Sequence, residues 1–101
     1  MAIFHLATPE QWVEAQTRGT LAPRTLATEG FVHCSTDEQL AGTIERHFDD
    51  IDELVLLRLH EEGLGGDLRW EQSRPGEPYP HLYRAIELSE VAEAIPWHRD
   101  R

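Results

Sequence analysis

Six residues of the chain have side chains that could bind or transform a polar ligand, and they lie far apart in the sequence. They are His5, His33, Ser35, Glu71, His81 and Tyr83. Histidine changes its charge near neutral pH, so a carboxylate or hydroxyl beside it is typical of acid–base chemistry and of ligand binding. Each of the six falls in a predicted strand, near its end or beside aromatic residues. We therefore predict that these side chains line one shared cleft.

The segment 30–36, with the sequence GFVHCST, is predicted to be a short strand that leads into a helix. Side chains alternate along a strand, which would place His33 and Ser35 on one face and Cys34 on the other. Cys34 is therefore predicted to be a buried, small apolar residue and not a nucleophile assisted by His33.

Ser35 also belongs to a helix-start pattern, which leaves two roles open for it. Ser35 with Glu38, and Thr36 with Gln39, each have the spacing of a capping box. If Thr36 caps the helix, the Ser35 hydroxyl is free for a ligand. If Ser35 caps the helix, His33 is the one residue of this strand that remains a candidate for the site.

The hydrophobic pattern predicts one α+β domain over residues 1–101, with a small, mostly antiparallel sheet as its core. Two helices are expected in the N-terminal half, one between Thr8 and Gly19 and one over 37–48, with a loop over 21–29 between them. The predicted strands cover 3–6, 30–36, 54–59, 68–71, 81–86 and 94–97. The apolar run 54–59 is expected to be a central strand, and 94–97 an edge strand because it contains Pro96.

The composition restricts the partners of the protein. Nineteen acidic residues face nine basic ones, giving a formal net charge of -10, which argues against a nucleic-acid partner. The chain contains no lysine, which excludes Schiff-base chemistry on a lysine and a phosphate-loop lysine. A single cysteine, no membrane-length apolar run and no secretory leader pattern lead us to expect a cytoplasmic protein. The expected partner is a small-molecule ligand bound in the predicted cleft.

Two other functions fit the same residues. His5, His33 and His81 could supply three nitrogen ligands to a metal, with Glu71 as a fourth ligand or a base, as in a metal-dependent hydrolase. No HxH or HExxH spacing occurs, so we do not predict a metal site. A non-catalytic binding module would use the same cleft without turnover. Trp70 is expected to pack in the core, whereas Tyr83 could stack on a planar ring.

The motifs together resemble a known bacterial family, domain of unknown function 952. They are IFHL at 3–6, EGFVHCST at 29–36, LRWE at 68–71 and PHLY at 80–83. The resemblance extends over nearly the whole chain. The fold of that family is similar to the ADP-ribosyltransferase superfamily, which includes the RNA 2′-phosphotransferases.

This resemblance implies roles for four of the six candidate residues, whereas His81 and Tyr83 belong to the pattern of the smaller family and have no counterpart in the superfamily. His5 is similar to the first-strand histidine that binds the NAD ribose, Ser35 with His33 to the second motif, and Glu71 to the glutamate that assists transfer. The implied ligand is NAD or ADP-ribose, bound by His5, Ser35 and Tyr83. Together with His81, which is a candidate from the pattern of the smaller family, the predicted catalytic residues are His5, His33, Ser35, Glu71 and His81. The implied activity is transfer or hydrolysis of an ADP-ribosyl or related group.

Overall fold

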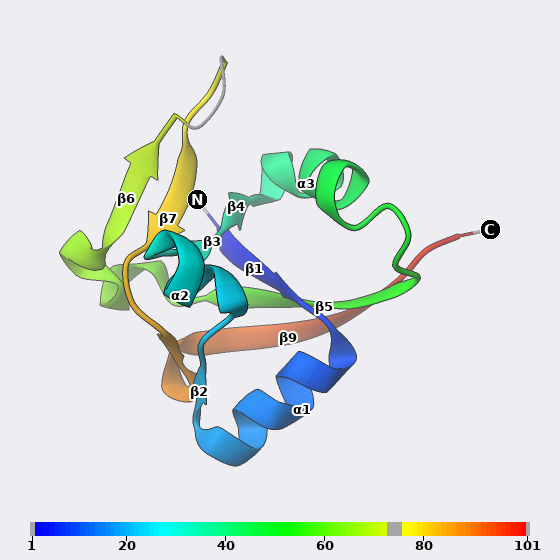
Figure 1. Cartoon of the computed structure of the whole chain (residues 1–101), viewed down its shortest axis with the longest axis horizontal. Coiled ribbons are helices and arrows are strands. Elements are labelled where there is room, and N and C mark those ends of the chain that lie inside the picture. Colours follow the sequence, from blue (N-terminus) through cyan, green and yellow to red (C-terminus); the bar gives the residue numbers. More distant parts are fainter. Residues whose placement is uncertain (1, 73–75, 101) are drawn as a thin grey trace.

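An antiparallel sheet forms the centre of the protein in a computed structural model that describes residues 2–72 and 76–100 (Figure 1). Its strands, in spatial order, are β4 (Ser35–Thr36), β1 (Ile3–Ala7), β5 (Glu53–Leu59) and β9 (Val91–His98). The apolar run predicted as the central strand is β5, which pairs with β1 on one side and β9 on the other. β9 is an edge strand, as its proline predicted, because an edge tolerates a residue without an N–H group.

Two smaller sheets complete the β-structure of the described residues. One contains β3 (Val32–His33), β7 (Tyr79–Leu82) and β6 (Leu68–Glu71), with β7 in the middle. The other pairs β2 (Thr20–Leu21) with β8 (Ile86–Glu87). Every strand pair in the described residues is antiparallel, which confirms the predicted α+β class with an antiparallel core.

The α-helices of the described residues are α1 (Pro9–Arg18), α2 (Arg24–Glu29) and α3 (Leu40–His47). α1 begins as predicted, because Thr8 and Gln11 form a capping box, and it ends at Gly19 in the left-handed conformation. Short 3-10 turns occur at Asp37–Gln39, Glu61–Gly63, Gly65–Asp67 and Leu88–Glu90. No helix among the described residues is both long enough and apolar enough to cross a membrane.

The prediction of a loop over 21–29, and of only two helices, was wrong because that segment contains α2. α2 buries none of its residues, so no apolar periodicity marks it in the sequence. Its limits come from Pro23, which precedes the first turn, and from Gly30, which ends the helix with φ of 89°. The loop predicted over 72–78 includes residues 73–75, which lie outside the described residues.

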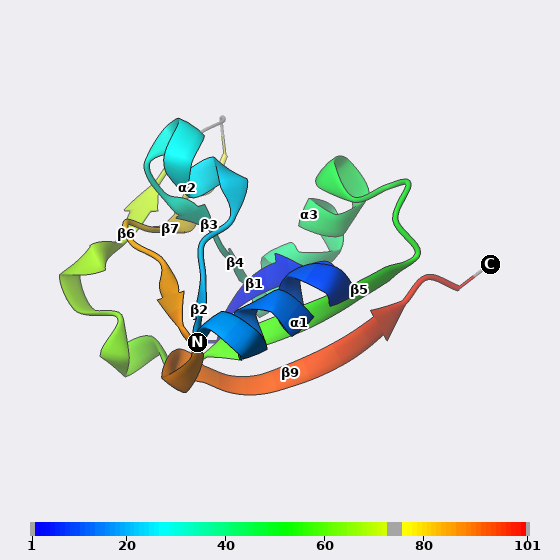
Figure 2. The ribbon, with the colours of Figure 1, turned by 60° about the horizontal axis from the view of Figure 1, so that its bottom comes forward.

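The two faces of the four-stranded sheet bury two apolar clusters. One face packs against α1, both smaller sheets and the turn that carries Leu64. The opposite face packs Leu6 and Leu54 against Ile44 of α3. Figure 2 shows α1 lying over β1 and β5, with the chain running from β3 through β4 towards the edge of β1. The segment that joins β3 to β4 therefore passes from one sheet into another.

Candidate functional site

The segment 30–36 is not one continuous strand, which changes where its polar side chains point. β3 pairs with β7 in the three-stranded sheet, whereas β4 pairs with β1 in the central sheet. Cys34 lies between them, and its N–H donates to the carbonyl oxygen of Pro80 over 3.0 Å. Strand alternation does not hold across a change of sheet, so the prediction that His33 and Ser35 share a face was wrong.

Ser35 lies against α3 and away from the histidines. It pairs with Phe4, the neighbour of His5 in β1, so Ser35 and His5 lie on opposite faces of the central sheet. Its side chain is buried, and its Oγ lies 2.9 Å from the Thr43 hydroxyl. Thr36, not Ser35, forms the capping box with Gln39. Although Thr36 takes the capping role, the Ser35 hydroxyl is already paired within the protein.

One face of the three-stranded sheet gathers most of the candidate residues. We call this surface the histidine face, and its side chains are Phe31, His33, Arg69, Glu71, His81 and Tyr83. His81 pairs with His33 on one side and with Arg69 on the other, so these three form a row across the sheet. The opposite face carries Val32 and Leu82 into the apolar core. The outward face is therefore the one available for a ligand.

Glu71 is the hydrogen-bond acceptor at the centre of the histidine face. Its Oε1 accepts from the Tyr83 hydroxyl over 2.5 Å and lies 2.8 Å from His81 Nδ1. The hydrogen bonds from Tyr83 and His81 lower the pKa of Glu71. The same carboxylate raises the pKa of Tyr83. At neutral pH the face thus contains an ionised Glu71 and a protonated Tyr83.

Aromatic contacts order the remaining side chains of this face. Phe31 stacks on His81 with ring centroids 4.1 Å apart and an interplanar angle of 20°. The His33 ring meets His81 edge-on, with centroids 5.4 Å apart. The guanidinium of Arg69 lies 4.6 Å from the centroid of the Tyr83 ring. The face therefore combines an exposed cation, a carboxylate and several ring surfaces.

His5 lies at the point where β3 and β1 meet. The backbone pairing of β1 with β4 ends at Phe4, and the next link is made by the His5 side chain, whose Nδ1 lies 2.8 Å from the His33 carbonyl oxygen. A carbonyl only accepts, so Nδ1 carries the proton and the neutral ring has its lone pair on Nε2. Nε2 is buried and has no hydrogen-bond partner among the described residues.

Burial keeps the His5 ring uncharged. Desolvation lowers its pKa, and the nearby charge of His33 lowers it further, whereas the hydrogen bond to the His33 carbonyl acts in the opposite direction. A neutral ring with an unpaired lone pair can accept a hydrogen bond from a hydroxyl donor. His5 is thus joined to the histidine face through His33, although its side chain lies in the core layer.

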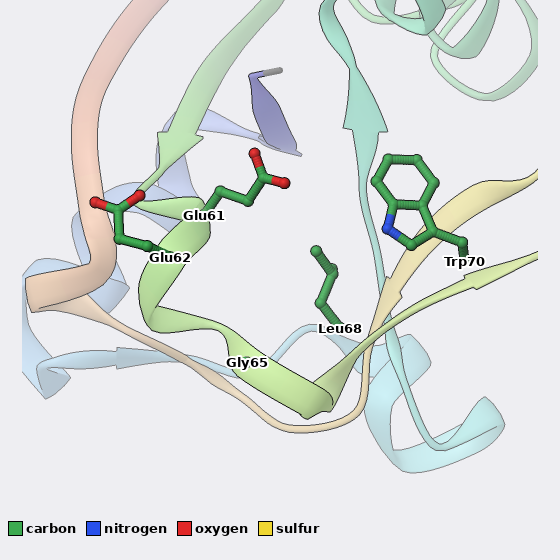
Figure 3. Close-up of a pocket in the computed structure, with 5 residues that line it drawn as sticks. All are labelled: Glu61, Glu62, Gly65, Leu68 and Trp70. Carbon is green, nitrogen blue, oxygen red and sulfur yellow. The ribbon is translucent and has the colours of Figure 1, made fainter.

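The structure confirms the burial predicted for Cys34 and contradicts the burial predicted for Trp70. Cys34 is buried, as predicted, and burial raises the pKa of its thiol to about 12. Trp70 is 42% exposed, so the prediction that it packs in the core was wrong. With Leu68, it projects from β6 into a hollow of about 480 Å³ bounded by Glu61 and Glu62 (Figure 3). This hollow lies on the face of β6 opposite to Arg69 and Glu71.

The described residues offer no arrangement for a metal ion. Within residues 2–72 and 76–100, no group of three or more histidine, cysteine, aspartate or glutamate side chains is placed to hold one. Nδ1 of His5 and of His81 each take part in a hydrogen bond to an oxygen of the protein.

Two contributors to this region were not among the sequence candidates. Glu29 lies 2.8 Å from His33 Nε2 and follows the i, i+4 spacing, which could have indicated the pair. Phe31 shares a strand face with His33. Its stacking on His81, however, depends on the pairing of β3 with β7, two strands that lie far apart in the chain.

The fold and its polar surface define a small α+β protein with a histidine-rich face on a three-stranded antiparallel sheet. The chain belongs to the DUF952 family, described as "Protein of unknown function", whose sequence profile matches residues 6–94. The family resemblance predicted from the motifs is thereby confirmed.

Solved structures of one bacterial protein, CC0527 from Caulobacter crescentus, have the same fold. Its crystal structure is 35% identical in sequence, with a TM-score of 0.92, and the match covers 99% of this chain and 89% of that chain. Its solution NMR structure is 35% identical with a TM-score of 0.86, covering 98% of this chain and 86% of the other. No curated protein matches the chain.

Proposed function

We propose that the chain binds a nucleotide-like small molecule of the NAD or ADP-ribose type beside His5 and over the histidine face. The observation that supports this proposal best is the buried lone pair of His5 Nε2, which has no donor among the described residues. An unpaired buried polar atom costs about 1–3 kcal/mol, so such atoms are uncommon without a role. A ribose hydroxyl is a donor that would complete this nitrogen once the side chains that cover it move aside to admit the ligand.

The composition of the histidine face supports a ligand with an anionic part and a planar part. Arg69 is exposed and offers a guanidinium to a phosphate. Tyr83 offers an aromatic ring for stacking on nicotinamide or adenine. Both hydrogen bonds that join Glu71 to other side chains of the described residues end on its Oε1, so within that part of the chain its Oε2 is the oxygen that could accept from a ribose hydroxyl.

The same placement supports group transfer as the accompanying chemistry. Cleavage of a bond at the anomeric carbon of ribose develops positive charge on the sugar. An ionised Glu71 beside the ribose would stabilise that charge electrostatically. In this proposal His5 orients the ribose, and Ser35 takes no part because its hydroxyl is paired with Thr43 on the far side of the central sheet.

The proposal is tested by calorimetric titration of NAD and of ADP-ribose into the wild-type protein and into His5→Asn. An asparagine amide nitrogen replaces Nδ1 at the same number of bonds from the backbone, so it can still donate to the His33 carbonyl, but it has no counterpart of Nε2. We expect binding by the wild type and about tenfold weaker binding by His5→Asn. His98→Asn, which changes an exposed histidine on β9, is the matched control and should bind as the wild type does.

Absence of binding of both molecules by the folded wild-type protein would contradict the proposal. Binding of equal strength by wild type and His5→Asn would contradict the role of His5. Binding without any turnover would leave the chain as a binding module.

A further inference from the structure

Resting on the proposed function, we infer that His81 is the general base of the histidine face and that the acceptor of the transferred group is a hydroxyl, from water or an alcohol. The inference depends on how three side chains hold one imidazole ring.

The hydrogen bond to Glu71 determines which ring nitrogen of His81 carries the proton. An ionised carboxylate only accepts hydrogen bonds, so Nδ1 must donate across the 2.8 Å separation. In the neutral ring the lone pair is then on Nε2. A carboxylate that orients a histidine in this way also stabilises the imidazolium formed when Nε2 takes a proton.

Tyr83 keeps that carboxylate in place. Its hydroxyl donates to the same Oε1 that faces His81, and its own ring contacts Phe31 with centroids 5.4 Å apart. Because both donors converge on one oxygen, Glu71 cannot turn away from His81 without losing two hydrogen bonds. Glu71 and Tyr83 are therefore positioning residues for the His81 ring.

Phe31 and His33 restrict the ring itself. Phe31 covers one side of the His81 ring by stacking, and His33 meets it edge-on. His81 is only 3% exposed. These contacts hold the ring in one orientation and so fix the direction in which its Nε2 points.

With NAD as the donor of the group, the step balances as follows. Nε2 of His81 takes the proton from the hydroxyl of the acceptor, and the hydroxyl oxygen forms a bond to the anomeric carbon of the ribose. The bond from that carbon to the nicotinamide nitrogen breaks, and its electron pair neutralises the positive charge of the nicotinamide ring. His81 later releases its proton to solvent.

The test combines a spectrum of the wild-type protein with the turnover of one variant. Nitrogen-15 NMR of histidine-labelled protein at pH 8 should find His81 protonated on Nδ1 and bare on Nε2. The reverse tautomer would overturn the inference whatever ligand the protein binds. This measurement needs no variant, so it does not depend on whether a substitution is tolerated.

Turnover is measured as release of nicotinamide from NAD in water and in water with added methanol. His81→Asn keeps a donor to Glu71 but lacks Nε2, so we expect it to bind ADP-ribose like the wild type and to release nicotinamide about 100-fold more slowly or less. A merely structural His81 would be rescued by asparagine, and equal release rates would overturn the inference. Failure of the wild type to bind either molecule would instead contradict the proposed function, while binding without release into either acceptor would overturn the inference alone.

Discussion

The Nδ1 atom of His5 lies 2.8 Å from the main-chain carbonyl oxygen of His33, where the backbone pairing between β1 and β4 has just ended. This one hydrogen bond joins the central sheet to β3 of the three-stranded sheet. It also determines the tautomer of His5, so the unpaired nitrogen of the ring is Nε2. A substitution at His5 therefore affects both the junction of the sheets and the proposed ligand contact, and asparagine separates the two effects.

Stability should depend on pH through His5 in the range below about pH 6.5. Burial lowers the pKa of His5 in the folded protein below its ordinary value of 6.5, so the unfolded chain binds the proton more readily. The stabilisation is present above pH 6.5 and is lost as the pH falls below it. Urea unfolding followed by tryptophan fluorescence measures the free energy of unfolding at each pH. Plotted against pH, this free energy should have a slope that His5→Asn reduces by at most about 1.4 kcal/mol per pH unit. Identical slopes in the two proteins would contradict this prediction.

The pKa of Glu71 should rise when Tyr83 is replaced by phenylalanine. The Tyr83 hydroxyl is the largest cause that lowers the Glu71 pKa below 4.5, and phenylalanine removes only that hydroxyl. Carbon-13 NMR of the carboxyl groups measures the midpoint directly. Glu90, whose pKa is lowered mainly by Arg84, is the internal control and should titrate alike in both proteins. A Glu71 midpoint that stays the same would show that the hydrogen bond does not hold in solution.

Gly30→Ala should lower the free energy of unfolding by about 1–2 kcal/mol, because an alanine is strained at the left-handed φ of 89° that ends α2. No atom lies within 4 Å of the position of an added Cβ, so backbone strain is the expected cause. Gly66→Ala is the matched control, since this exposed glycine also has space around it and does not have positive φ. Equal urea midpoints for the two variants would contradict the prediction.

The Cys34 thiol should react slowly with a thiol reagent in the native protein at pH 8. Its pKa of about 12 leaves little thiolate, and the side chain is buried in the main apolar cluster. In denaturing urea the reaction should become fast, because the thiol regains an ordinary pKa of about 8.5. Rapid labelling of the native protein would mean that the segment between β3 and β4 opens readily.

Thr36→Ala should cost about 1 kcal/mol of stability, because it removes the capping box at the start of the helical segment that contains α3.

Ser35→Ala should leave the affinity for ADP-ribose unchanged, since Ser35 lies on the opposite face of the central sheet from His5. Weaker ADP-ribose binding by Ser35→Ala would contradict this prediction and show that Ser35 contributes to the binding site.

The strongly patterned parts of the fold were predictable from the sequence, and the change of sheet at Cys34 was not. The apolar run of β5, the cap of α1 and the proline of β9 each carry a local signal that decides their structure. β3 and β4 are too short to show which neighbours they pair with. Their partners β7 and β1 lie far away in the chain, so the positions of His33 and Ser35 depended on non-local pairing.

The candidate site was predictable only where two residues lie on one face of the same strand or of neighbouring strands. Glu71 with His81, and His81 with Tyr83, follow from alternation on β6 and β7 once these strands are paired. The exposure of Trp70 could not be predicted, because alternation assigns a face but does not show whether that face is covered. The hydrogen bond between His5 and the His33 carbonyl involves a backbone atom, for which the sequence contains no signal.

Ligand binding beside His5 is tested most directly by the nitrogen-15 signal of His5 Nε2 in histidine-labelled protein, recorded with and without ADP-ribose. We expect a bare nitrogen in the free protein whose signal shifts on addition of ADP-ribose, as a hydroxyl donates to it, while the signals of the exposed His98 stay in place. Binding of ADP-ribose with an unchanged His5 Nε2 signal, or an Nε2 that is already protonated in the free protein, would contradict this expectation.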